Sequence, residues 1–305
     1  MIVDAHQHLW TEPLIAALGA RRALPLIRRE QGEWILHLAG EPTCAIVPDV
    51  PADRARLLRQ DDVDVALIAL SSPLGIEGLA PDEARGLIDA HTSGVRSFGP
   101  LFPRWGAVPL ADPDPADVDR QLDGGAIGIS LPAGALSTPR DLHRVGPLLE
   151  RLEARGAPLF VHPGPNPWAT AHLSGTIGPE WWPALTTYVT QMQAAWLTIV
   201  TEGQLAHPRL RVLFALLAGG APLHAERLAA RGGPTVDPSD SRLFYDTSSH
   251  GPHALAALGV TGIQLVHGSD RPVTGPTTPV ARSRAVDAPA RLLGSFLPST
   301  PAVNA

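Results

Sequence analysis

The sequence has only one cysteine, Cys44, among its 305 residues. A single thiol cannot form a disulfide within the chain and suits a reducing compartment, so we expect a cytoplasmic protein. A metal site in this chain would need nitrogen and oxygen ligands, because one thiolate cannot supply a cysteine cluster. The cysteine count therefore excludes a disulfide scaffold and directs the search for ligands to His, Asp and Glu.

Basic residues and long apolar runs are also scarce. The chain has 24 Lys and Arg residues against 30 Asp and Glu residues, a formal net charge of −6, with no basic block. We therefore expect neither nucleic acid nor an anionic membrane surface as a partner. No apolar run reaches the ~18–20 residues of a membrane span, and no signal-peptide pattern opens the sequence. The expected partner is a small-molecule substrate.

Short apolar runs, by contrast, recur in a regular pattern. Hydrophobic residues make up 44% of the chain, and its 32 prolines and 29 glycines indicate many loops between the runs. Eight runs are typical of buried strands, and a helical stretch precedes each one after the first. The first predicted strand ends at His8, and the others span Val63–Leu70, Trp105–Leu110, Ala126–Leu131, Pro158–His162, Leu210–Leu216, Leu243–Asp246 and Gly262–Gly268.

Eight strands of this kind predict an α/β fold, a closed (β/α)8 TIM barrel that forms a single domain over 1–305. The alternative is an open doubly wound sheet. A dinucleotide-binding sheet of that type would need Gly-x-Gly-x-x-Gly after its first strand, and the sequence has no such motif there. The closed barrel is therefore the preferred prediction.

Three stretches depart from the repeat. After the first strand we expect a helix over about Glu12–Leu26. A small inserted hairpin is expected at about 33–47, and His37 within it is more typical of a hairpin surface than of a ligand. The C-terminal tail, about 276–305, is expected to contain a last helix, Asp287–Leu293, and a loose end.

Histidines and an aspartate lie at the ends of three predicted strands. His6 and His8 close the first strand, His162 closes the fifth, and Asp270 follows the eighth. Alternate residues of a strand face one side, so His6 and His8 share a face, ~6–7 Å apart at Cα. The carboxyl ends of all barrel strands meet at one rim. Three imidazoles and a carboxylate are a normal site for Zn²⁺, with Fe²⁺ or Mn²⁺ as alternatives.

The motifs around these residues resemble those of a known family. Val-Asp-Ala-His-Gln-His at Val3–His8, Val-His-Pro-Gly at Val161–Gly164 and Gly-Ser-Asp-Arg-Pro at Gly268–Pro272 resemble the amidohydrolase superfamily, over roughly 1–275. The resemblance is to the amidohydrolase 2 branch, with its aminocarboxymuconate-semialdehyde, γ-resorcylate and 6-methylsalicylate decarboxylases. It implies a barrel enzyme, commonly a homodimer, with one divalent metal ion. The ligands that it implies are His6, His8, His162 and Asp270.

The sequence departs from that family in strands four and six. Strand four carries Ser130, where binuclear members have a bridging lysine or glutamate, so we expect a single metal ion. After strand six the branch usually has a histidine two residues before a Gly-Gly, and here Leu217 occupies that position. Either the usual chemistry is absent or another group transfers protons, and the catalytic candidates are Asp270 and His250. Two further histidines are more typical of packed or surface positions: His224 and His267.

Substrate contacts are expected from residues beside the predicted metal. Arg271 could hold a carboxylate through two parallel hydrogen bonds, or could form an ion pair. Trp10 is expected to line the mouth of the barrel, where it would contact an apolar or aromatic substrate. Three more tryptophans either join it or pack loops: Trp168, Trp181 and Trp182. Asp4 could orient a histidine or cap the barrel bottom, and Asp246 could cap a helix or face the pocket.

The expected function is a metal-dependent decarboxylase or hydrolase acting on a small, aromatic or unsaturated, carboxylic acid or acyl compound. A decarboxylase would protonate the carbon that bears the carboxylate before CO₂ leaves, whereas a hydrolase would attack an acyl centre with metal-bound hydroxide. Two alternatives stay open, an Fe- or Mn-dependent oxygenase on the same barrel and a non-catalytic binding or partner subunit. A barrel without metal is the simplest alternative.

Overall fold

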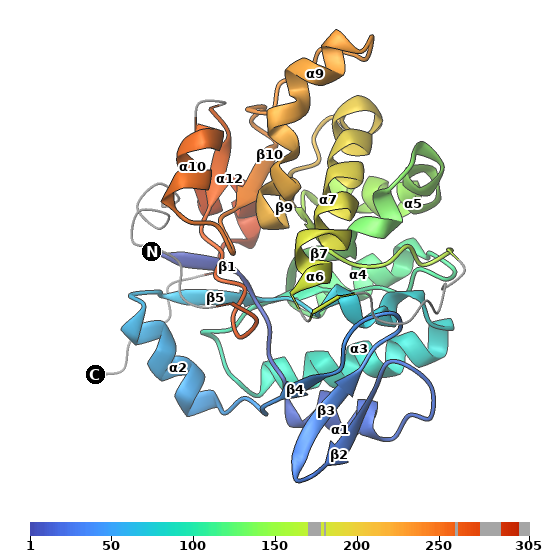
Figure 1. Cartoon of the computed structure of the whole chain (residues 1–305), viewed down its shortest axis with the longest axis vertical. Helices are drawn as coiled ribbons and strands as arrows, with labels where there is room; N and C mark the ends of the chain where they lie inside the picture. The colour runs from blue at the N-terminus through green and yellow to red at the C-terminus, as the bar shows by residue number, and fades with distance from the viewer. Residues whose placement is uncertain (170–177, 180, 260–261, 275–287, 299–305) are drawn as a thin grey trace.

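The centre of the protein is a sheet of eight parallel strands, seen in a computed structural model that describes residues 1–169, 178–179, 181–259, 262–274 and 288–298 (Figure 1). The strand order is β1-β5-β6-β7-β8-β9-β10-β11. The strands are β1 Val3–Gln7, β5 Val65–Ile68, β6 Arg104–Gly106, β7 Ala126–Pro132, β8 Leu159–His162, β9 Val212–Phe214, β10 Leu243–Asp246 and β11 Gln264–Val266. All eight predicted strands are confirmed. Most are shorter than predicted, whereas β10 has the predicted bounds and β7 is one residue longer.

The first and last strands close this sheet on itself. The backbone N–H of Ala5 in β1 donates to the carbonyl of His267 after β11, at 2.8 Å. Gln7, two residues further along β1, forms a parallel bridge with Arg271 across the same seam. The predicted closed (β/α)8 barrel is therefore confirmed, and the open doubly wound sheet is excluded.

Helices surround the barrel (Figure 1). The longer ones are α2 Pro51–Gln60, α3 Pro81–Arg96, α4 Pro115–Asp123, α5 Pro139–Arg155, α7 Thr187–Thr198, α9 Ala225–Ala230, α10 Pro252–Gly259 and α12 Ala288–Leu293. Each helix from α2 to α5 has a proline in its first turn, where the missing N–H costs no hydrogen bond. Two single turns, α6 Trp182–Leu185 and α8 Gln204–Ala206, flank α7. Within the described residues, no helix combines the length and the apolar character that a membrane crossing requires.

Aromatic side chains fill the interior of the barrel. Trp105 of β6 and Phe160 of β8 are buried, with ring centroids 5.2 Å apart. The indole N–H of Trp105 donates to the carbonyl of Ala5 across the barrel, at 3.0 Å. Gly128 of β7 leaves room for this ring, since a Cβ there would lie 2.7 Å from Trp105 Cζ3. The ring of Phe160 lies 5.0 Å from that of His6, so these aromatic rings form a floor under the end of β1.

A three-stranded antiparallel sheet is inserted after the first strand and helix α1, Glu12–Gly19. The expected hairpin corresponds to β3 Glu33–His37 and β4 Cys44–Ile46 and is confirmed. The expected helix over Glu12–Leu26 is wrong at its C-terminal end, because β2 Leu26–Glu30 pairs with β3. The helix already ends at Gly19, and Pro25, which disfavours helical backbone at the residue before it, marks the turn into β2.

The last predicted helix is confirmed as α12, Ala288–Leu293. Leu292 and Leu293 are buried against the main core. The remainder of the expected tail lies largely outside the described residues, at 275–287 and 299–305.

A buried carboxyl group after β5 gives the barrel a pH-dependent stability. Glu77 is 1% exposed, and its carboxyl accepts a hydrogen bond from the Ser72 hydroxyl at 2.8 Å. Burial raises the pKa of Glu77 to about 7, from 4.5. The folded state therefore keeps a proton that the unfolded state loses above pH 4.5, so the free energy of unfolding falls as the pH rises towards 7.

We expect Glu77→Gln to match the wild type below pH 4.5 and to exceed its free energy of unfolding above pH 7. The expected gain is about 3 kcal/mol, because each pKa unit corresponds to ~1.4 kcal/mol. Urea denaturation at a series of pH values measures this difference. Glu226→Gln, at an exposed position, is the control and should give no such pH trend. A constant difference between Glu77→Gln and the wild type from pH 4 to 8 would contradict the assignment.

Candidate metal centre

The structure brings the four predicted ligands together at the carboxyl end of the barrel. One nitrogen or oxygen of each lies within 4.8 Å of the others, and all four residues are buried. The Nε2 atoms of His6 and His8 are 3.1 Å apart. Asp270 Oδ1 lies 3.4 Å from the first and 3.2 Å from the second. The ring of His162 stands edge-to-face to both histidines, at 4.8 and 5.0 Å between centroids.

Each imidazole is oriented by a hydrogen bond on its outer side. Nδ1 of His6 lies 2.5 Å from Asp246 Oδ2, Nδ1 of His8 lies 2.9 Å from the Ala69 carbonyl, and Nδ1 of His162 lies 2.8 Å from the Pro163 carbonyl. Carbonyl and carboxylate oxygens can only accept, so Nδ1 of each ring carries a proton and donates it. The three Nε2 atoms are therefore left for the interior of the cluster, which is the arrangement of histidines that bind metal ions.

This donor set fits a divalent cation. Neutral rings place two Nε2 lone pairs and a carboxylate oxygen within 3.1–3.4 Å of one another, which is repulsive unless a positive charge lies between them. Without a cation, a proton can supply that charge. Burial lowers the pKa of His6, but the carboxylates of Asp246 and Asp270 outweigh burial and raise it to about 9. Three nitrogens and one oxygen are a normal zinc or manganese ligand set.

The electrostatics of the other ligands follow from the same proximity. Burial, with the nearby His6 and His8, lowers the pKa of His162 well below its ordinary value. Burial acts to raise the pKa of Asp270, but the three histidines around it lower it on balance. The neutral imidazole and the ionised carboxylate are the forms that bind a metal ion.

Backbone contacts across the barrel seam hold Asp270 beside the first strand. Its N–H donates to the His6 carbonyl at 2.8 Å, and the N–H of His8 donates to the Arg271 carbonyl at 2.7 Å. Asp270 has a left-handed backbone, with φ of 55°, which aspartate tolerates better than most residues. A Cβ at Gly268 would lie 3.0 Å from Asp246 Cγ and 3.1 Å from His6 Cβ. The Gly-Ser-Asp motif thus permits close packing of the two ends of the sheet.

Asp246, at the end of β10, holds the ring of His6. Its other oxygen, Oδ1, accepts from the backbone N–H of Ser248 at 2.8 Å and from the Ser248 hydroxyl. Asp4 instead accepts from the backbone N–H groups of His6 and Ser269, at 3.2 and 3.0 Å. Both aspartates therefore support the cluster, one through a ring and the other through the backbone.

We expect Asp246→Asn to weaken divalent-metal binding by about 10- to 100-fold, because loss of an outer hydrogen-bond acceptor makes a histidine a poorer ligand. Competition with a chromogenic chelator measures the affinity. Asp237→Asn is a matched control, since Asp237 accepts from the backbone and hydroxyl of Ser239 in the same local turn and lies at the surface. Equal metal affinities of Asp246→Asn and the wild type would rule out this role.

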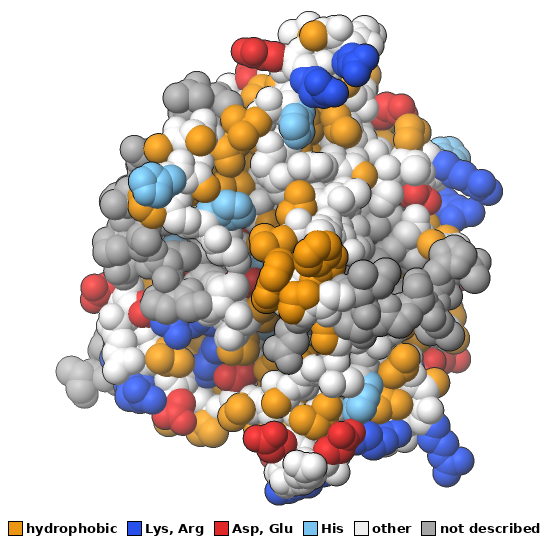
Figure 2. All heavy atoms as spheres, viewed as in Figure 1, with side chains coloured by type: hydrophobic (Ala, Val, Ile, Leu, Met, Phe, Trp, Pro, Cys, Tyr) orange, Lys and Arg blue, Asp and Glu red, His pale blue; other side chains and the backbone are white. Residues whose placement is uncertain are grey.

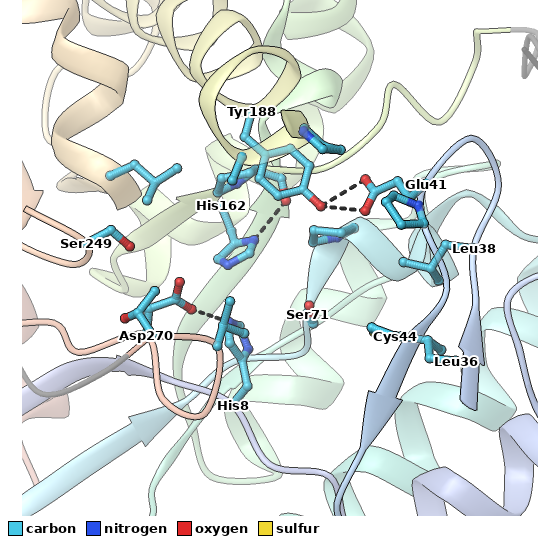
Figure 3. A pocket seen from close by; sticks show the side chains of 18 of the residues that line it. His8, Leu36, Leu38, Glu41, Cys44, Ser71, His162, Tyr188, Ser249 and Asp270 are labelled. Carbon is cyan, nitrogen blue, oxygen red and sulfur yellow. Dashed lines mark hydrogen bonds and ion pairs between the residues drawn. The ribbon is translucent and has the colours of Figure 1, made fainter. Parts of the chain in front are cut away.

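A cavity of about 280 Å³ opens above the cluster and has the four candidate ligands at its base (Figure 3). Its walls are mostly apolar and come from the inserted sheet, the barrel loops, α6 and α7. The apolar wall residues are Trp10, Leu36, Leu38, Pro42, Pro73, Pro163, Pro183, Ala184, Leu216 and Val273. The cavity therefore suits a small ligand with an apolar or aromatic body and a polar end at the cluster.

Of the three other predicted site residues, one lines the cavity and two do not. Trp10 lines the cavity, and its contact with a substrate stays a prediction. The guanidinium of Arg271 lies 2.6 Å from Asp61 Oδ2, in the ion pair that was the alternative to substrate binding, and it does not line the cavity. His250 is also absent from the described wall, where Ser249 takes its place, and its Nδ1–H donates to the Ser248 carbonyl. The catalytic role of His250 therefore stays a prediction without support from the geometry of the cavity.

The loop after β9 contributes a leucine to the wall, but it is the neighbour of Leu217, the residue at the position of the family's usual histidine. Leu216 lines the cavity, whereas Leu217 is fully buried away from it. Five consecutive residues, 216–220, have a left-handed backbone, with φ between 50° and 77°, so strand alternation does not continue past Phe214. No titratable side chain from this loop lines the described cavity wall.

The remaining predicted residues have structural surroundings. His37 pairs with Glu30 at 2.8 Å on the inserted sheet, and His224 is exposed. The indole N–H of Trp168 donates to the Leu110 carbonyl, as loop packing requires. Within the described residues, four others also lie outside the cavity wall: Ser130, Trp181, Trp182 and His267.

Two polar residues of the wall, Glu41 and Tyr188, were not predicted from the sequence. Glu41 lies between β3 and β4 of the inserted sheet, and Tyr188 lies on α7. The sequence contains only two tyrosines, but nothing in its pattern says which way α7 faces. Only the folded insertion brings the two residues together.

The sequence matches no protein family model and no curated protein. Several solved structures share the fold. An amidohydrolase II has a TM-score of 0.72 at 18% identity, over 96% of this chain and 99% of that one. The apo IDCase of Metarhizium anisopliae has a TM-score of 0.71 at 18% identity, over 97% and 95%. The 5-carboxyvanillate decarboxylase of Novosphingobium aromaticivorans, with manganese and a nitrobenzoic acid, has a TM-score of 0.66 at 16% identity, over 94% and 93%.

These likenesses confirm the resemblance to the amidohydrolase barrels at the level of the fold. Identities of 16–18% carry no conclusion about the reaction of this chain. The chemistry has to be argued from the cluster and the cavity above it.

Proposed function

We propose that this protein is a metal-dependent enzyme that decarboxylates a small aromatic or unsaturated carboxylic acid. The observation that carries the proposal is the set of three imidazoles, each with Nδ1–H fixed outward and Nε2 facing Asp270, at the base of a mostly apolar cavity. A decarboxylase among the structural neighbours carries manganese and an aromatic acid, which supports the same class of ligand here.

The residues of this chain would divide the work as follows. His6, His8, His162 and Asp270 would hold one divalent ion, which supplies positive charge for the carboxylate of the acid. The apolar wall, including Trp10 and Leu216, would pack against the body of the substrate and exclude water. A proton is added to the carbon that bears the carboxylate, the C–C bond to that group breaks, and its electron pair stays with the substrate as CO₂ leaves. We assign the proton transfer to Asp270, the carboxyl group of the cluster that lines the cavity. As an ionised carboxylate it would first take up one proton from the solvent and would then pass that proton to the carbon.

Hydrolysis of an acyl compound is the second candidate. Asp270 lines the cavity, with its Oδ1 3.2–3.4 Å from two Nε2 atoms, and would accept a proton from the attacking water, while the ion held by the four ligands would supply positive charge to the acyl oxygen. The apolar wall favours an aromatic acid over a polar amide, so decarboxylation is the first proposal.

We also propose zinc as the resident ion, a homodimer in solution and a location in the cytoplasm. The imidazole-rich ligand set supports zinc, with iron or manganese as the alternatives. Exposed apolar side chains near α6 support a dimer, since Trp181, Trp182 and Leu185 are 57%, 41% and 67% exposed. Figure 2 shows an apolar patch over this part of the surface.

The proposal is tested with protein loaded with zinc, manganese or iron in turn. Release of CO₂ from hydroxybenzoate-type acids is expected, and hydrolysis of lactones and amides is the comparison. His6→Ala should remove both activities. Turnover that persists after complete removal of the metal would refute the proposal, and metal-dependent cleavage of lactones alone would favour the second candidate.

A further inference from the structure

The far wall of the cavity carries one pair of hydrogen-bonded polar residues, Glu41 and Tyr188. The Tyr188 hydroxyl lies 2.8 Å from Glu41 Oε1 and 2.7 Å from Oε2 (Figure 3). A phenol has one proton and can donate it to one oxygen at a time. The remaining lone pairs of the carboxylate and of the hydroxyl can only accept. Beyond its one internal hydrogen bond, the pair offers acceptors to the cavity.

Both members of the pair are held in place by contacts of the surrounding backbone. On α7, Gln191 Oε1 accepts from the Gly164 N–H at 3.0 Å, and Gln193 Nε2 donates to the Gly219 carbonyl at 2.9 Å. The inserted sheet is tied to the barrel where the Trp10 N–H donates to Asp49 Oδ2, at 2.7 Å. The pair is therefore positioned before any ligand arrives, which lowers the cost of binding.

The partial burial of the pair strengthens a hydrogen bond that a ligand donates to it. Burial raises the pKa of Glu41, although the bond from Tyr188 opposes that change. Burial and the neighbouring carboxylates of Glu41 and Asp270 raise the pKa of Tyr188, so its hydroxyl keeps its proton. A half-buried carboxylate with free lone pairs gains more from a donor than an exposed one does.

We propose that Glu41 and Tyr188 select the substrate by accepting a hydrogen bond from a hydroxyl or amino group at the end of the molecule remote from the cluster. This inference rests on the proposed function, because it assumes that the carboxylate of the acid occupies the cluster end. It narrows the substrate class to hydroxy- or amino-substituted acids that carry one carboxylate. A second carboxylate at the remote end would face Glu41 and be repelled.

Ligand binding to the metal-loaded full chain tests the inference without requiring turnover. Isothermal titration calorimetry with zinc-loaded protein compares benzoate, 3- and 4-hydroxybenzoate, 4-aminobenzoate and benzene-1,4-dicarboxylate. The wild type is expected to bind the best hydroxy or amino acid about tenfold more tightly than benzoate, as one hydrogen bond to a charged group provides. It should bind the dicarboxylate more weakly than benzoate. Comparison of the hydroxybenzoates with 4-aminobenzoate shows whether a hydroxyl or an amino donor is preferred.

Glu41→Gln is expected to lose most of the donor preference and to bind the dicarboxylate at least as well as benzoate. Tyr188→Phe removes the hydroxyl that orients Glu41, should weaken the same preference, and replaces Glu41→Gln if that variant does not fold. Glu33→Gln, at an exposed position on the same inserted sheet, is the matched control and should behave as the wild type. Metal content is measured for every variant.

Unchanged selectivity in Glu41→Gln, or a wild type that binds none of these acids while fully loaded with zinc, would overturn the inference. Decarboxylation that does not depend on Glu41 would leave the proposed function standing and remove the inference. Donor selectivity that depends on Glu41, without turnover of any acid, would support the inference and count against the proposed function.

Discussion

Replacement of His162 by alanine is expected to weaken divalent-metal binding by about 10²- to 10³-fold and to reduce turnover at least as much. Structural zinc sites with four ligands bind with ~10–16 kcal/mol, so one ligand accounts for about a quarter of that free energy. His162 lies at the end of β8, and its Nδ1 contacts only the carbonyl of the next residue, Pro163. Its removal should therefore leave the barrel seam and the Asp246–His6 hydrogen bond intact.

Chelator competition and turnover measure this effect, and the Tm of the metal-free proteins shows whether the fold survives. His37→Ala is the control, because His37 is a histidine of the inserted sheet with Glu30 as its partner. The control should keep full metal affinity and activity. A His162→Ala protein that binds zinc as the wild type does would show that the cluster is not the metal site.

Replacement of Trp105 by alanine is expected to lower the free energy of unfolding by about 3–5 kcal/mol, the usual cost of deleting a large buried aromatic ring. Trp105 is 1% exposed, its ring packs on Phe160, and its N–H donates to the Ala5 carbonyl. The variant therefore leaves both a cavity inside the barrel and a carbonyl without its donor.

Urea denaturation measures this loss. Leu205→Ala removes a large apolar side chain from a position that is 81% exposed and should change the free energy of unfolding by less than about 0.5 kcal/mol. Because Phe160 also packs on His6, the folded Trp105→Ala protein should bind metal more weakly as well. Equal stabilities of the two variants would contradict the account of the barrel floor.

The barrel and its cluster could be predicted because both follow from short-range pattern and general geometry. Buried parallel strands are continuous apolar runs, so all eight were visible in the sequence. Side chains at strand ends meet at one rim, so His6, His162 and Asp270 could be placed together without knowing any loop.

The wall of the cavity could not be predicted, because it depends on contacts between distant segments. Strand alternation would place alternate residues after Phe214 on one face, but the left-handed backbone at 216–220 turns Leu216 into the wall instead. Glu41 lies in a loop whose position depends on how the inserted sheet packs against the barrel. Arg271 stands beside a predicted ligand, yet its guanidinium is drawn to Asp61 by charge.

The seam that closes the barrel determines when the metal centre can first exist. His6 and His8 belong to the opening strand, whereas Asp270 follows the closing one and bonds to the His6 carbonyl. During synthesis on the ribosome the two histidines emerge long before the aspartate, so a partly made chain cannot assemble the four ligands. Metal binding at the proposed centre would thus be a late event that requires a closed barrel. Conversely, separation of these two edges would release the ion while the other strands are still paired.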